Sequence, residues 1–71
     1  MRQPSAGEAL ASALSAEYAA IYAYGRIGVR LSGAARDAAR QAEAAHRRRR
    51  DALVVQLTTA GGVVPPDRAG Y

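Results

Sequence analysis

The sequence contains no cysteine, so no disulfide can stabilise the fold and no thiolate can bind a metal ion. Residues 1–20 contain no apolar run of the length found in a secretory signal. No stretch approaches the roughly 20 apolar residues of a membrane-spanning helix. These absences predict a cytoplasmic protein that has no membrane partner.

Large apolar side chains are few, because much of the 49% hydrophobic content is alanine. Alanine strongly favours helix but adds little volume to a core. Ordering a chain of 71 residues costs on the order of 100 kcal/mol of conformational free energy. Two helices alone bury too little apolar surface to offset that cost. We therefore expect a second copy of the chain, or helices missing from this sequence, to complete the core.

Lysine is also absent, and arginine supplies every positive side chain of a protein with net charge +4. The run from Arg47 to Arg50 would point to nucleic acid if its members shared one exposed face. On a helix, such a run is distributed around all faces, and Asp37 and Asp51 dilute the positive field. We therefore expect a solvated basic surface and no nucleic-acid partner.

Local signals predict two long helices. The Ser-x-x-Glu spacing that begins at Ser5 matches a capping box, in which each side chain binds the other residue's amide. It predicts a first helix over about residues 5–31, which ends before Gly33 because glycine can take the left-handed conformation beyond a helix. A second helix is expected over about residues 34–60, where a Gly-Gly pair ends it and a Pro-Pro pair prevents its restart. We expect residues 61–71 to be extended or disordered.

Each predicted helix has about 26 residues and a length of roughly 40 Å, and the connection between them is very short. Long helices with a short connection pack antiparallel and adjacent to each other. The prediction is therefore a single all-α unit over residues 1–71. It is an antiparallel two-helix hairpin that forms half of a four-helix bundle.

A helical projection at about 100° per residue places one acidic side chain, Glu17, in the middle of the apolar stripe of the first helix. On the second helix, Glu43 and His46 interrupt the apolar stripe in the same way and are neighbours on the helix surface. These polar groups should face the interior of a bundle. The first stripe also contains Leu10, Leu14, Ile21, Tyr24, Gly28 and Leu31, and the second contains Ala35, Ala39, Ala42, Arg50, Leu53, Leu57 and Ala60.

The three polar residues also lie at similar heights in the predicted hairpin. Measured from the turn, Glu17 lies at roughly 23 Å and the Glu43–His46 pair at roughly 16–20 Å, a difference of about one helical turn. A carboxylate buried without a partner is costly, and carboxylate and imidazole ligands suit iron or manganese. Glu17, Glu43 and His46 are therefore candidate metal ligands.

Each candidate ligand also has an interpretation without a metal. Glu17 could pair with an arginine, for which Arg50 on the inward face of the second helix is the first candidate. Glu43 could form an i,i+4 ion pair with Arg47. His46 could be a core or boundary histidine that is hydrogen-bonded to a tyrosine or a carboxylate.

A Glu on one helix followed by Glu-x-x-His on the next is half of the ferritin-like di-iron carboxylate signature. Residues 16–25, Ala-Glu-Tyr-Ala-Ala-Ile-Tyr-Ala-Tyr-Gly, and residues 46–53, His-Arg-Arg-Arg-Arg-Asp-Ala-Leu, make the likeness more specific. Over about residues 8–71 the sequence resembles the N-terminal half of an actinobacterial ferritin-like domain family of unknown function. Members usually continue into two further helices, so the resemblance implies that missing sequence or a homodimer completes the bundle.

The resemblance implies a ferritin-like protein that binds a di-iron or di-manganese carboxylate site and oxidises or stores iron. Glu17, Glu43 and His46 would be the ligands, and Tyr24 and Arg50 would support them from the surrounding shell. The alternative is a metal-free ferritin-like scaffold or interaction module with an Arg–Glu polar core.

Overall fold

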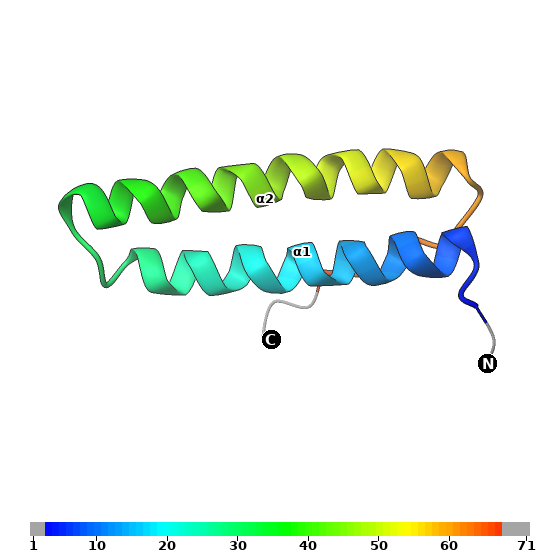
Figure 1. The fold of residues 1–71 in the computed structure, drawn as a ribbon, viewed down its shortest axis with the longest axis horizontal. Coiled ribbons are helices and arrows are strands. Elements are labelled where there is room, and N and C mark those ends of the chain that lie inside the picture. Colours follow the sequence, from blue (N-terminus) through cyan, green and yellow to red (C-terminus); the bar gives the residue numbers. More distant parts are fainter. Residues whose placement is uncertain (1–2, 68–71) are drawn as a thin grey trace.

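Two antiparallel helices make up the fold. The computed structural model describes residues 3–67. Helix α1 spans Ala6–Gly28 and α2 spans Gly33–Thr59, and the two lie side by side along their lengths (Figure 1). No strand occurs within the described residues. The predicted all-α hairpin is confirmed.

The start of α1 has both hydrogen bonds of the predicted capping box. Ser5 is the N-cap residue, its Oγ accepts from the Glu8 amide at 3.1 Å, and its own amide donates to Glu8 Oε1 at 3.4 Å. The helix ends at Gly28, earlier than the expected end near residue 31. Glycine has a low helix propensity, and beyond it the amides of Arg30 and Leu31 bond to the carbonyls of the preceding turn. A tight turn therefore replaces the last expected turn of helix.

Gly33 takes the left-handed conformation expected of it, with φ at 59°. It does so as the first residue of α2, however, and not at the C-terminus of α1. Ser32, the N-cap residue of α2, makes no capping hydrogen bond through its side chain. The connection thus uses its glycine to direct the chain into α2.

Two backbone hydrogen bonds from the glycines that follow α2 cap its C-terminus. Gly61, with φ at 77°, and Gly62 donate their amides to the carbonyls of Thr58 and Leu57, each at 3.0 Å. This is the Schellman arrangement of hydrogen bonds. A Cβ atom added to Gly62 would overlap Cδ1 of Leu57, so any other residue at this position requires the buried Leu57 side chain to shift.

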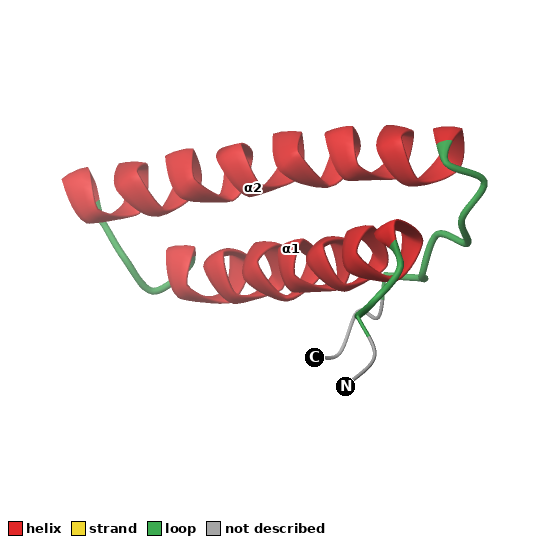
Figure 2. Ribbon diagram, turned by 45° about the vertical axis from the view of Figure 1, so that its right-hand side comes forward, coloured by secondary structure: helices red, strands yellow, loops and turns green. Residues whose placement is uncertain are grey.

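Residues 62–67 form a tail without helix or strand that folds back onto α1 (Figure 2). Val64 packs against the buried side chains at that end of the hairpin, and the Tyr18 hydroxyl donates to the Pro65 carbonyl at 3.2 Å. The sequence allowed the tail to be extended or disordered. Its described part is held against α1 by these contacts, and the expectation for residues 68–71 lies outside the described residues.

The apolar core lies where the N-terminal half of α1 meets the C-terminal half of α2. Leu14 and Leu57 are 0% and 1% exposed, and Tyr18 is buried beside them. We call this region, together with Val64 of the tail, the closed end. Half-buried side chains that pack around it are Leu10, Ala11, Leu53 and Val54.

The half of the hairpin nearer the turn is packed more thinly. Its buried residues among those described are small ones, Gly28 and Ala39. The large apolar side chains Ile27 and Val29 are 48% and 80% exposed. Neither described helix is long and apolar enough to cross a membrane.

Candidate functional site

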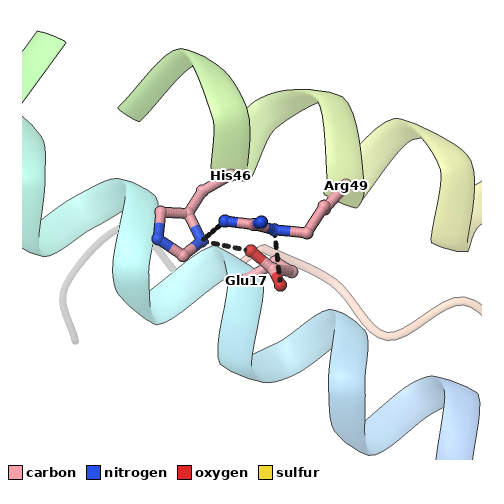
Figure 3. A network of polar contacts seen from close by, with 3 residues as sticks. All are labelled: Glu17, His46 and Arg49. Carbon is pink, nitrogen blue, oxygen red and sulfur yellow. Dashed lines mark hydrogen bonds and ion pairs between the residues drawn. The ribbon is translucent and has the colours of Figure 1, made fainter. Parts of the chain in front are cut away.

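Glu17 and His46 meet in the middle of the hairpin, one from each helix (Figure 3). His46 Nδ1 lies 2.5 Å from Glu17 Oε1. Both side chains are partly enclosed, with 16% of Glu17 and 23% of His46 exposed. The structure therefore brings together two of the three candidate ligands, at one level of the hairpin.

Arg49 approaches the same pair from α2. Its Nε lies 3.6 Å from Glu17 Oε2, and its Nη2 lies 3.3 Å from His46 Nδ1. An ionised carboxylate only accepts hydrogen bonds and a guanidinium only donates them. With Glu17 ionised, the proton of the short contact therefore belongs to His46 Nδ1, and Arg49 and His46 are two donors around one acceptor. We call Glu17, His46 and Arg49 the Glu17 network.

The ring of Tyr24 stacks on the imidazole ring of His46. The ring centres lie 5.5 Å apart, a usual distance for an offset aromatic pair, with 24° between the planes. Because Nδ1 is engaged by Glu17, a neutral His46 keeps its lone pair on Nε2. Tyr24 thus lies beside His46, on the inward stripe where the helical projection places it.

Glu43 lies apart from the Glu17 network. Its Oε2 accepts from Arg47 twice, from Nη2 at 2.7 Å and from Nε at 3.2 Å. This is the i,i+4 ion pair that the sequence offered as the alternative for Glu43. Such a pair on a helix surface stabilises the helix by only about 0.2–0.5 kcal/mol.

The arginine beside Glu17 is Arg49, whereas the sequence favoured Arg50. Arg50 Nε instead donates to Asp51 Oδ1 at 3.0 Å. Neighbouring residues on a helix point about 100° apart. Arg49 follows His46 by nearly one turn and lies on the same flank of α2, so it reaches the carboxylate that His46 binds. Arg50 points to the other flank.

The geometry of one chain brings two candidate ligands together and leaves the third outside. Among residues 3–67, no group of three or more histidine, aspartate and glutamate side chains is gathered closely enough to hold a metal ion. The oxygens of Glu17 already contact His46 and Arg49, and Glu43 is engaged by Arg47. The donor set of a single chain does not fit a di-iron or di-manganese centre, and the ligand roles of Glu17, Glu43 and His46 stay predictions.

A second polar group, which the sequence reasoning missed, lines a hollow of about 320 Å³ on another side of the hairpin. There Arg26 Nη1 donates to the Tyr22 hydroxyl at 2.9 Å, and the guanidinium carbon lies 5.7 Å from the centre of that ring. The hydrogen bond raises the pKa of Arg26 above its ordinary value. The i,i+4 spacing of the two residues was the available signal. The hollow is lined by Tyr18, Ile21, Tyr22, Gly25, Arg26, Glu43, Arg47 and Asp67.

A comparison with known protein families identifies the family to which this chain belongs. Over residues 9–71 its sequence matches the family described as Domain of unknown function (DUF4439). The chain belongs to this family. The match covers most of α1, all of α2 and the tail, so the Glu17 network and the tail contacts both lie within the DUF4439 domain. No curated protein and no solved structure matches the chain.

Proposed function

We propose that this DUF4439 hairpin is a ferritin-like interaction module, half of a four-helix bundle that a second copy of the chain completes. The observation that carries the proposal is the set of partners around Glu17. Both of its carboxylate oxygens face donors of the protein itself, His46 Nδ1 and Arg49 Nε. These contacts support the interpretation as a metal-free scaffold with an Arg–Glu polar core, to which His46 adds a third member.

Electrostatics supports this interpretation. An enclosed carboxylate is destabilising unless it is paired or hydrogen-bonded. Glu17 satisfies that condition within one chain, because it is hydrogen-bonded to His46 Nδ1 and forms an ion pair with the Arg49 guanidinium. No buried side-chain nitrogen or oxygen among the described residues lacks a hydrogen-bond partner. The pairing of Glu17 within one chain therefore supports a polar centre that needs no metal ligand.

Packing supports the second copy. The fully buried large side chains of the described chain are Leu14 and Leu57, which is a small core for two helices of this length. Helices gain most of their stability from tertiary packing of an apolar face. Leu10, Ile21 and Leu53, which belong to the same stripes, are only half-buried, so association would remove further apolar surface from water.

The test combines metal analysis with a titration by ferrous iron under anaerobic conditions. We expect the purified chain to carry no stoichiometric metal and to keep its melting temperature when iron is added. A matched Glu17→Ala variant controls for weak surface binding. Stoichiometric iron that raises the melting temperature of the parent chain, and is lost in Glu17→Ala, would overturn the proposal.

A second candidate function is a di-iron or di-manganese centre formed between two copies. It is favoured by the position of Glu17 and His46, which come from different helices to one level of the hairpin. Two copies would supply four carboxylates and two imidazoles if Glu43 exchanged Arg47 for metal. A bound di-metal centre would supply oxidation of ferrous iron. The same iron titration decides between this function and the interaction module.

A further inference from the structure

The hairpin has two unlike faces on either side of the plane that contains the helix axes. The tail lies against one of them, where Asp67 lines the same hollow as Tyr22 and Arg47. None of the Glu17 network residues lines that hollow. In Figure 3 the three labelled side chains stand in front, and the trace of the tail passes behind α1. We call these the tail face and the network face.

The two faces also differ in chemistry. The tail face carries paired charges and hydroxyl groups, such as Arg26 with Tyr22 and Arg47 with Glu43. By the helical projection the network face is formed from half-buried alanine, leucine and tyrosine around one polar group. The apolar members of the network face are Leu10, Tyr24, Ala42 and Leu53.

We propose that the second copy docks on the network face, and that the tail closes the other face to it. This inference rests on the proposed function and assigns the surface that the association uses. The tail already occupies part of its face through Val64 and the bond from Tyr18 to Pro65. None of the contacts described for residues 62–67 is made with Glu17, His46 or Arg49.

Charge complementarity favours a copy of this chain as the occupant. The network face presents both signs of charge, one carboxylate on Glu17 and one guanidinium on Arg49. Arg49 is 57% exposed, and its fork of five N–H donors is only partly used by Glu17. A two-fold axis at this level brings a second carboxylate to each guanidinium. A uniformly acidic partner would instead be drawn to the exposed arginines that form no ion pair within residues 3–67, which are Arg30, Arg36, Arg40 and Arg48.

The size of the face matches what a stable dimer requires. The molecule extends 44 Å by 22 Å in its two longest directions, which gives a footprint of at most roughly 970 Å². Stable protein interfaces bury about 800 Å² on each partner. This upper bound exceeds that area only slightly, so a dimer through the network face has to use most of the length of the hairpin.

Single-cysteine variants test the choice of face, because the natural chain has no cysteine. Ala42→Cys places a thiol on the network face, one turn before His46. Ala44→Cys is the matched control, since it points about 200° further round the same helix and is exposed. The rate of maleimide labelling is measured for each thiol across a dilution series, beside sedimentation of the same samples.

We expect Ala42→Cys to be protected in the dimer and to become reactive on dilution, while Ala44→Cys reacts at the same rate throughout. A dimer in which Ala44→Cys is protected and Ala42→Cys is not would overturn the choice of face and leave the proposed association standing. A monomer at every concentration would overturn the proposed association itself.

Charge reversal provides a second test. Arg49→Glu puts a like charge beside Glu17 in both copies, which we expect to raise the dimer dissociation constant at least about tenfold. The control Arg48→Glu changes the same charge on an exposed residue off this face, and we expect a change below about threefold. Circular dichroism of both variants separates loss of association from loss of helix. Equal effects of the two variants on association would contradict the proposal.

Discussion

The closed end and the Glu17 network lie less than one helical turn apart on α1. The first is held together by buried apolar side chains, and the second by polar contacts between partly exposed side chains. At the closed end, Leu14 and Leu57 are almost wholly buried and the tail packs over them. At the Glu17 network, the interhelical contacts are polar and the side chains stay partly exposed. The comparison indicates that apolar burial at one end stabilises the hairpin. The middle holds a partly exposed polar group, which is the group that the proposed dimer would cover.

The largest expected effect comes from the closed end. Leu14→Ala removes a fully buried side chain and should lower the free energy of unfolding by about 2–5 kcal/mol. Chemical denaturation followed by circular dichroism at 222 nm, a helix signal, measures the change. Val55→Ala is the control, because Val55 is 64% exposed and its truncation should cost less than about 0.5 kcal/mol. Similar losses in the two variants would mean that the closed end is not the core.

The second-largest expected effect concerns the Glu17 network. Glu17→Gln keeps the shape of the side chain but removes the charge that faces His46 and Arg49. Hydrogen bonds to charged groups contribute about 1.5–3 kcal/mol, so we expect a loss in this range by the same denaturation assay. Glu43→Gln removes an i,i+4 surface pair and should cost less than about 0.5 kcal/mol. An equal cost for both glutamates would contradict the distinction between the network and the surface pair.

A pair of glycine substitutions tests how tightly Gly62 packs against Leu57 at the closed end, with Gly25 as the comparison. Gly62→Ala forces a Cβ into Leu57 and should destabilise the hairpin by about 1–3 kcal/mol. Gly25→Ala meets nothing within 4 Å and lies inside α1, where alanine is favoured over glycine by about 0.5–1 kcal/mol. The two substitutions should therefore shift the melting temperature in opposite directions. A neutral Gly62→Ala would show that the tail does not pack as described.

The smallest expected effect concerns the tail. Tyr18→Phe removes the hydroxyl that donates to the Pro65 carbonyl while leaving the buried ring. Loss of one such hydrogen bond should cost about 0.5–1.5 kcal/mol. Amide hydrogen exchange should quicken at Gly62, whose amide donates to the Leu57 carbonyl at the base of the tail, while the middle of α2 is unchanged. Unaltered exchange at Gly62 would indicate that the contact from Tyr18 does not hold the tail.

Sequence patterns within one or two helical turns were sufficient to predict much of this fold. The capping box at Ser5 involves residues within one turn, and the Gly-Gly stop of α2 acts through the backbone of the same segment. Helical periodicity brought Glu17 and His46 to one inward level, because a short turn fixes the register of two adjacent helices. These predictions depended on spacing alone, which a single sequence contains.

The remaining features depend on side-chain direction and on contacts distant in sequence. Arg49 and Arg50 both lie near the inward stripe, and only the flank on which His46 meets Glu17 distinguishes them. The bond from Tyr18 to Pro65 joins residues from opposite ends of the sequence, and no local pattern indicates it. Proline was interpreted only as a helix breaker, although its carbonyl remains a hydrogen-bond acceptor.

Sedimentation equilibrium of the intact chain, followed from micromolar to millimolar concentration, tests the central claim most directly. The account predicts a reversible species of twice the mass of one 7.4 kDa chain, with helix content that rises as the dimer forms. A fully helical monomer over the whole range would contradict it, because the hairpin would then be stable without a second helix pair.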